Sequence, residues 1–204
     1  MNKRFDERVR VSYSSLELVD DFEDLKHELV REAMRLTGVT SGVEITTIAD
    51  IPSRGTGLGS SSTVTVGLLN ALHKFAGRDA SPDQLAEEAC LIEIDILGQP
   101  IGRQDQYAAA FGGINVISFD SEGVRVEPIM VSCESQIRDE FTLVFTGLSR
   151  SASEVLREVP RDPNNKLTRL RKIRNQADTA EQFLNEGELS KLGILIGESW
   201  HEKR

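Results

Sequence analysis

A glycine- and serine-rich segment that runs directly into an apolar helix constrains this chain most strongly. Glycines stand at the alternate positions Gly55, Gly57 and Gly59, and three serines follow at 60–62. Glycine lets the backbone take conformations and close approaches that a Cβ atom would block. The serines fall where the next helix is predicted to begin, at the end with unpaired N–H groups and the positive pole of the helix dipole. The segment therefore predicts an anion-binding loop, and phosphate is the usual anion.

Two common phosphate-binding motifs are excluded by the residues of this segment. A Walker A loop needs a lysine, and none occurs between Asp50 and His73. The dinucleotide fingerprint needs a third glycine where Ser60 stands. A Gly/Ser-rich surface loop is the structural alternative. Pro52 before the loop and the apolar helix behind it favour phosphate binding.

Length, charge and cysteine content limit the class of protein. The 204 residues suffice for one sizeable domain or one and a half small ones. The formal net charge of −9 argues against nucleic-acid binding and makes a phosphate loop depend on a metal ion. No apolar run has the length of a membrane span, and residues 1–8 lack the apolar stretch of a signal peptide, so no membrane partner is expected. Cys90 and Cys133 are predicted to be free thiols of a cytoplasmic protein.

Hydrophobic periodicity predicts helices and strands along the whole chain. Strands are predicted at 7–13, 43–48 and 141–145, a hairpin at 114–119 and 124–129, a loop at 160–165, and helices at 22–37, about 61–77, 151–159, 166–185 and 188 to the end. The strand at 141–145 is continuously apolar and is expected to be buried. In the last helix a stripe is expected to pack against a partner element; it consists of Leu189, Leu192, Ile196 and Trp200.

One further helix carries a carboxylate at a position expected to be buried. Ser81, Pro82 and Gln84 form a helix start signal with an N-cap and a capping box, and the pattern continues to Leu97. Glu93 falls in the middle of a wide apolar arc of this helix. A buried carboxylate is unfavourable unless it is paired or binds a metal. The pattern leaves two interpretations open: a metal ligand, and a structural salt bridge or a side chain that reaches a solvated edge.

The segment 98–113 is a turn-rich entry to a short apolar helix that ends at a double glycine. Asp105 stands at the start of this helix. An aspartate in this place is most often a helix cap. The residues alone therefore assign it no chemistry.

With these features in place, the chain resembles the GHMP kinases. Gly57-Leu58-Gly59-Ser60-Ser61 matches the second motif of that superfamily, and the residues from Ile92-Glu93 through Gln104-Asp105-Gln106-Tyr107 to Gly113 are similar to its heptose-phosphate kinase branch. The resemblance implies an α+β fold. Residues 1–137 would form most of a ribosomal-protein-S5-like N-terminal domain, and residues 138–204 part of a ferredoxin-like C-terminal domain.

The resemblance also implies a function. It is ATP-dependent phosphoryl transfer to a hydroxyl of a sugar or sugar phosphate, with heptose 7-phosphate as the expected substrate and ATP and Mg²⁺ as cofactors. Asp105 would orient or deprotonate the sugar hydroxyl, Arg103 would be a neighbouring cation, and Ser61 and Glu93 would bind the metal. The residues expected to hold the ATP phosphates are Gly55, Gly57, Leu58, Gly59, Ser60, Ser61 and Ser62.

Two motifs of the resemblance are absent from these 204 residues. They are an early Gly-Gly-x-x-Asp segment and a Gly-rich third motif near the phosphates. Two alternatives follow: a catalytically inactive protein of the same fold that binds nucleotide or sugar, and a kinase fragment. Because these motifs would close the site, we expect the isolated 204-residue chain to be poorly active or inactive as a sugar kinase, and to self-associate through uncovered sheet edges and apolar helix faces.

Overall fold

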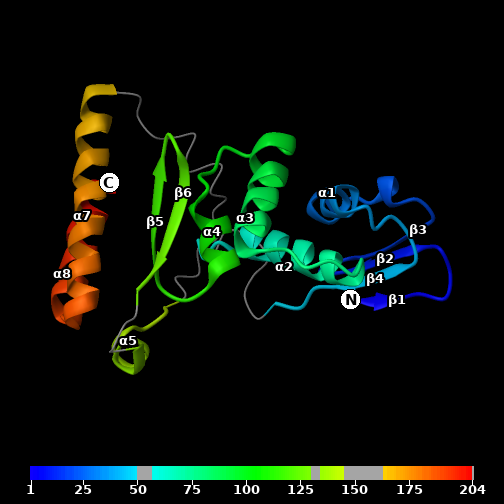
Figure 1. Ribbon diagram of the computed structural model, residues 1–204, viewed down its shortest axis with the longest axis horizontal. Coiled ribbons are helices and arrows are strands. Elements are labelled where there is room, and N and C mark those ends of the chain that lie inside the picture. Colours follow the sequence, from blue (N-terminus) through cyan, green and yellow to red (C-terminus); the bar gives the residue numbers. More distant parts are fainter. Residues whose placement is uncertain (50–56, 130–133, 145–162, 204) are drawn as a thin grey trace. The chain divides into compact units, whose positions relative to one another are not determined.

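The computed structural model describes residues 1–49, 57–129, 134–144 and 163–203 (Figure 1). These residues form two compact units, with the division between Gly112 and Gly113. The first unit holds the glycine loop and every site residue that the structure describes. A boundary between family domains near residue 138 remains a prediction, because the compact units are defined by packing alone.

The first unit is built on a four-stranded sheet in the order β1-β4-β2-β3. Its strands are β1 (Asn2–Lys3), β2 (Val9–Ser12), β3 (Leu16–Val19) and β4 (Val43–Thr46). β2 runs parallel to β4 and antiparallel to β3. The strands predicted at 7–13 and 43–48 are confirmed as β2 and β4. The two outer strands, β1 and β3, were not predicted; β1 has only two residues, and both side chains of β1 are exposed.

The helix predicted at 22–37 is wrong in its first part. A 3₁₀ turn, η1 (Phe22–Asp24), comes first, and α1 (Glu28–Thr37) begins after a break. The carboxylate of Glu17, on β3, accepts hydrogen bonds from the backbone N–H groups of Lys26 and His27 at 2.6 and 3.2 Å. These bonds satisfy N–H groups at the start of α1. A contact from a distant strand therefore sets the beginning of this helix.

One hydrophobic core joins the sheet to the helices of the first unit. α1 lies over one face of the sheet (Figure 1), and α2 (Ser60–Phe75) packs against α1, α3 and α4. Burying each of these large apolar side chains contributes about 1.5–3 kcal/mol. The fully buried residues of this core include Val9, Val11, Val30, Met34, Val43, Leu69, Leu72 and Ile92.

The predicted helix at 81–97 has the expected extent but not the expected form throughout. It is an α-helix, α3 (Pro82–Cys90), that continues as a π-helical segment, η2 (Leu91–Ile96). Ser81 caps it as predicted, since its side chain accepts the N–H of Gln84 at 3.2 Å. The wider π turn is seen in the bond from the N–H of Leu97 to the carbonyl of Ile92, 2.9 Å long. Such segments occur often at functional sites.

After η2 the chain turns into α4 (Gln104–Phe111), the last described helix of the first unit. α4 packs against both α2 and α3. It ends at Gly112, whose φ of 63° lies in the left-handed region that favours glycine. The short helix predicted after Gly102 is therefore confirmed.

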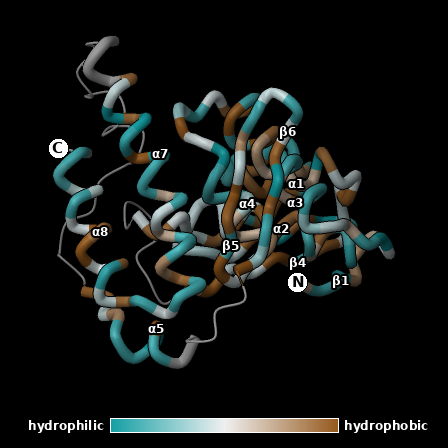
Figure 2. The backbone as a smooth tube through the Cα atoms, turned by 60° about the vertical axis from the view of Figure 1, so that its left-hand side comes forward, coloured by the Kyte–Doolittle hydropathy of each residue, from teal (hydrophilic) through white to brown (hydrophobic). Residues whose placement is uncertain are grey.

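The described part of the second unit contains a hairpin and three helices. They are β5 (Asn115–Asp120), β6 (Gly123–Pro128), α5 (Glu134–Glu140), α7 (Pro163–Glu186) and α8 (Leu189–Lys203). Hydrophobic and hydrophilic residues follow one another along the hairpin strands (Figure 2), as predicted for this hairpin. The loop predicted at 160–165 is wrong from Pro163 onward, because α7 begins there. Proline is well tolerated in the first turn of a helix.

The buried strand predicted at 141–145 is also wrong for its described part. Residues 141–144 form no strand, and the side chains of Leu143 and Val144 are 77% and 72% exposed. An apolar run becomes a buried strand only if a neighbouring strand accepts it. In the described part of this unit, β5 and β6 pair only with each other. The helix predicted at 151–159 lies outside the described residues.

The two C-terminal helices pack on each other, and the first half of the apolar stripe predicted on α8 takes part in this packing. Leu189 and Leu192 are buried and contact Ile137 of α5 and Phe183 of α7. The second half of the predicted stripe, Ile196 and Trp200, is exposed. None of the described helices combines the length and apolar content needed to cross a membrane.

Candidate functional site

The centre of the candidate site is Glu93, whose side chain is 0% exposed. It lies in η2, the π-helical segment, and points into the first unit rather than to solvent. The sequence predicted this burial from the apolar arc on the helix. A carboxylate in such a place must have strong partners.

Glu93 receives hydrogen bonds from four neutral side chains. Ser61 Oγ and Thr65 Oγ1 donate to its Oε1 at 2.7 and 3.1 Å. Ser62 Oγ donates to Oε2 at 2.8 Å, and Gln106 Nε2 donates to the same oxygen. No Lys or Arg among the described residues forms an ion pair with Glu93, so the salt bridge left open by the sequence is not found there. The predicted approach of Glu93 to the serines is confirmed.

The described end of the glycine loop forms the N-terminus of α2. Gly57 and Gly59 have φ angles of 71° and 63°, and Gly59 is the N-cap residue of the helix. Ser60 is the first helical residue, so the N–H groups of the serines lie in the first turn, where they have no partner within the helix. Gly55 lies outside the described residues.

Asp105 lies against this same helix end. A Cβ atom placed on Gly59 would lie 3.3 Å from both Cγ and Oδ2 of Asp105. Asp105 is the second residue of α4 and not its N-cap, a position taken by Arg103. The helix-cap interpretation of Asp105 is therefore wrong for the N-cap position, and its carboxylate lies at the N-terminus of α2 instead.

A pocket with a volume of about 280 Å³ opens beside these groups. Its described lining residues carry no cation, and Asp105 is the one charged side chain among them. Positive potential in the pocket therefore comes from the N-terminus of α2. A phosphate group beside Asp105 would need an added cation to offset repulsion. The lining residues are Gly57, Leu58, Gly59, Thr63, Asp105, Ala108 and Ala109.

The Ser61 and Glu93 oxygens fit the requirements of Mg²⁺. Adjacent oxygen ligands of an octahedral Mg²⁺ are separated by about 2.9 Å, since each lies about 2.0–2.1 Å from the ion. Ser61 Oγ and Glu93 Oε1 are 2.7 Å apart. Ser61 lies at the surface, whereas Ser62 and Thr65 are buried. The described residues contain no cluster of three or more His, Cys, Asp or Glu side chains suited to a metal, so an ion here would keep several waters.

Arg103 is not brought together with Asp105 in the described structure. Its guanidinium lies near Cys90 and Tyr107. Burial raises the pKa of the Cys90 thiol to about 11, and the positive charge of Arg103 opposes this shift. Arg103 is exposed at the start of α4. The expectation that it assists Asp105 remains a prediction.

The sequence analysis missed two partners of Glu93. Thr65 stands four residues after Ser61 and therefore lies on the same face of α2. Gln106 directly follows Asp105 and is 0% exposed. The helical spacing could have identified Thr65. Nothing in the local pattern distinguishes Gln106 from a solvated glutamine.

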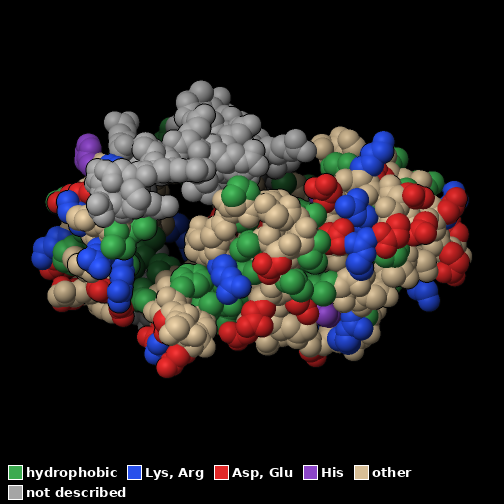
Figure 3. All heavy atoms as spheres, turned by 90° about the horizontal axis from the view of Figure 1, so that it is seen from above, with side chains coloured by type: hydrophobic (Ala, Val, Ile, Leu, Met, Phe, Trp, Pro, Cys, Tyr) green, Lys and Arg blue, Asp and Glu red, His purple; other side chains and the backbone are tan. Residues whose placement is uncertain are grey.

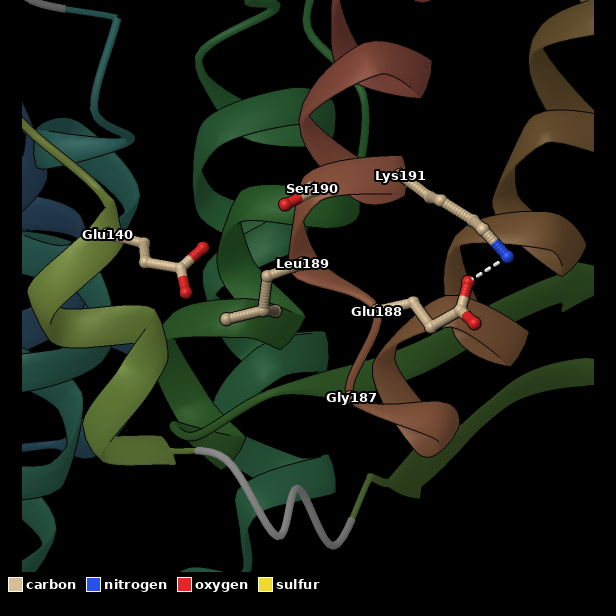
Figure 4. Close-up of a pocket in the computed structure, with 6 residues that line it drawn as sticks. All are labelled: Glu140, Gly187, Glu188, Leu189, Ser190 and Lys191. Atoms are coloured by element: carbon tan, nitrogen blue, oxygen red, sulfur yellow. Dashed lines mark ion pairs between the residues drawn. The ribbon is translucent and has the colours of Figure 1, made fainter.

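A second pocket, in the second unit, does not have the features of a site (Figure 4). It lies at the start of α8, between Glu140 of α5 and the residues 187–191. Glu188 and Lys191 point toward each other and form an ion pair. This pairing accounts for the charges of Glu188 and Lys191, and we assign the pocket no function.

On the face drawn in Figure 3, acidic and basic side chains of the described residues are interspersed. They form no continuous basic area on that face. This distribution agrees with the negative net charge and offers no surface for a nucleic-acid backbone there.

A comparison with known proteins places this loop within a described domain. Residues 25–113 match the family described as the GHMP kinases N terminal domain. It is similar to the D-glycero-alpha-D-manno-heptose 7-phosphate kinase of Campylobacter jejuni, with 28% identity over 91% of this chain and 55% of that protein. The chain thus spans about half the length of this relative.

Solved structures of two sugar kinases are also similar to this chain. A D-glycero-D-manno-heptose 1-phosphate kinase from Bacteroides thetaiotaomicron superposes with a TM-score of 0.81 at 25% identity, over 99% of this chain and 65% of that one. The galactokinase of Lactococcus lactis in complex with galactose gives a TM-score of 0.63 at 18% identity, over 97% of this chain and 64% of that one. The second likeness supports the fold alone. The predicted α+β fold of the GHMP kinases is confirmed.

Proposed function

We propose that this chain carries the nucleotide- and metal-binding centre of a sugar kinase that transfers the γ-phosphoryl group of ATP to a hydroxyl of a sugar phosphate. Heptose 7-phosphate is the proposed substrate, because a relative of that activity aligns with 91% of the chain. The observation that carries the proposal is that Glu93 and Asp105 meet the same helix end, the N-terminus of α2. Two carboxylates at an anion-binding helix end suit a metal-assisted phosphoryl transfer.

In this proposal each group has one task. The N–H groups of the first turn of α2 donate hydrogen bonds to phosphate oxygens. Ser61 and Glu93 hold Mg²⁺, which when bound neutralises charge on those oxygens. Asp105 accepts a hydrogen bond from the attacking hydroxyl and takes its proton as the new O–P bond forms, while the bond between the γ-phosphorus and the bridging oxygen breaks and ADP leaves with that oxygen. Leu58, Ala108 and Ala109 supply the apolar wall that limits the access of water.

A second candidate is a protein that binds nucleotide or sugar without catalysis. One observation favours it: all four donors to Glu93 are neutral side chains of this chain, so the carboxylate is satisfied without a metal. Binding of ATP that does not depend on Mg²⁺ would support this candidate over the kinase.

The test is a phosphoryl-transfer assay with ATP, Mg²⁺ and heptose 7-phosphate, in which the phosphorylated sugar is detected by mass spectrometry. Galactose, fucose and mevalonate serve as alternative acceptors. We expect the isolated chain to form product from heptose 7-phosphate only slowly, and Asp105→Asn to lower this rate by at least about 100-fold, since general-base contributions are about 10²–10⁴-fold. Equal turnover by wild type and Asp105→Asn would contradict the proposed role of Asp105.

A further inference from the structure

Gln106 is fully buried, yet only one end of its side-chain amide has a hydrogen-bond partner among the described residues. Its Nε2 donates a hydrogen bond to Glu93 Oε2, while its own Oε1 is buried without a hydrogen-bond partner among the described residues. Exchanging the two ends of the amide would place the carbonyl oxygen against the carboxylate, and two acceptors cannot bond to each other. The contact with Glu93 therefore fixes the amide orientation, although an acceptor is left unpaired.

The position of Gln106 distinguishes it from the other three donors. Ser61, Ser62 and Thr65 all belong to α2, whereas Gln106 belongs to α4. Gln106 thus links Glu93 to the helix that carries Asp105. Among the described residues, this bond is the one hydrogen bond that ties the Glu93 carboxylate to α4.

The donors also differ in exposure. Ser62, Thr65 and Gln106 are buried, and Ser61 lies at the surface. Oε2 accepts hydrogen bonds from the buried Ser62 and Gln106, and Oε1 accepts from the buried Thr65 and from Ser61. Ser61 is thus the exposed member of the four donors, and an ion would approach Oε1 from the side of Ser61.

We propose that Gln106 is a positioning residue that holds the Glu93 carboxylate with its Oε1 edge toward Ser61 and in register with Asp105. The proposal rests on the proposed function, because it concerns how the metal-binding carboxylate is oriented. Partners of this kind typically alter metal affinity by about 10–100-fold when they are removed. A side chain that only fills the core would change stability instead.

The experiment measures the affinity of the full chain for a fluorescent ATP analogue, once with Mn²⁺ and once with EDTA. The dissociation constant in EDTA divided by that with Mn²⁺ gives the factor by which the metal strengthens binding. A general loss of affinity changes both constants equally and leaves this ratio unchanged. Gln106→Leu removes the donor and keeps similar bulk. Gln104→Leu is the matched control, since Gln104 is exposed at the start of the same helix. We expect Gln106→Leu to reduce the ratio about 10-fold or more, with an unchanged dissociation constant in EDTA, and Gln104→Leu to match the wild type.

A second variant moves the carboxylate to position 106 while it keeps the hydrogen-bonded pair that the fold needs. Glu93→Gln combined with Gln106→Glu keeps one amide and one carboxylate in contact but exchanges their places. We expect this double variant to fold, to bind the analogue in EDTA, and to show no metal contribution. A metal contribution equal to that of the wild type, in either Gln106→Leu or the double variant, would overturn the inference. A wild-type chain without any metal contribution would instead overturn the proposed function.

Discussion

The carboxylate of Asp105 lies against the backbone of Gly59, where a Cβ atom would meet Asp105 Cγ and Oδ2 at 3.3 Å. Gly59 also has a φ of 63°, which L side chains rarely adopt. One glycine thus serves both as the N-cap of α2 and as the surface on which Asp105 rests. The catalytic geometry that we propose depends on this approach.

The first prediction compares alanine at two glycines of the loop. Gly57 has a similar φ of 71°, but no atom lies within 4 Å of an added Cβ. Both Gly57→Ala and Gly59→Ala should lower the free energy of unfolding by about 1–2 kcal/mol, the penalty for a left-handed alanine. Gly59→Ala alone should also displace Asp105 and weaken nucleotide binding. Urea denaturation and nucleotide titration test this; equal binding by both variants would argue against the contact.

The second prediction concerns the donors around Glu93. Glu93→Ala leaves Ser62 and Gln106 buried without their acceptor, whereas Thr65 keeps the Ser61 carbonyl; each unpaired group costs about 1–3 kcal/mol. We expect the free energy of unfolding to fall by about 2 kcal/mol or more. The control is Asp95→Asn, an exposed position on the same π-helical segment, which should change stability by less than about 0.5 kcal/mol. Similar effects of the two substitutions would show that Glu93 has no structural role.

The third prediction is a pH dependence carried by Glu32. Burial raises the pKa of this carboxyl, but hydrogen bonds and charges from Arg35 and Arg31 outweigh that effect and lower it overall. Because the folded pKa lies below the unfolded value of about 4.3, the stabilisation is present above that value and is lost as the pH falls through the folded pKa. The stability difference between wild type and Glu32→Gln should therefore be largest near pH 7 and shrink toward pH 3.

Thermal unfolding between pH 3 and pH 7 checks this dependence. Glu87→Gln, at an exposed carboxylate of α3, is the control and should give a small difference at every pH. A constant difference between wild type and Glu32→Gln across the range would mean that the arginine partners do not affect the titration of Glu32.

The fourth prediction is that the Cys90 thiol reacts slowly in the folded protein. Its side chain is buried, and burial raises its pKa to about 11, so almost no thiolate exists near pH 8. Alkylation by iodoacetamide, located by peptide mass spectrometry, should follow unfolding in a urea series. Rapid labelling of Cys90 without denaturant would show that this part of the core opens readily.

Much of the first unit could be predicted from sequence because its signals are local. The cap at Ser81, the glycine at the end of each helix and the apolar arc around Glu93 all act within a few residues. The burial of Glu93 follows from helical spacing alone. The approach of Ser61 to Glu93 was expected only from the resemblance, because nothing local relates positions so far apart in the chain.

The features that sequence analysis missed depend on distant partners. The start of α1 is set by Glu17 on another element, and residues 141–144 form no strand because the described residues offer no strand to pair with them. The π-helical form of η2 changes the helical period too little to be seen over six residues. Nothing in the residues around Gln106 indicates its contact with Glu93.

The central claim is that Glu93 and Asp105 form one metal-dependent phosphate site at the N-terminus of α2. Its most direct test is isothermal titration of ATP into wild type, Glu93→Gln and Asp105→Asn, each with Mg²⁺ and with EDTA. We predict that Mg²⁺ strengthens ATP binding to wild type and to Asp105→Asn, and that Glu93→Gln loses most of this gain. ATP binding that is absent, or equally strong with Mg²⁺ and EDTA in the wild type, would contradict the claim.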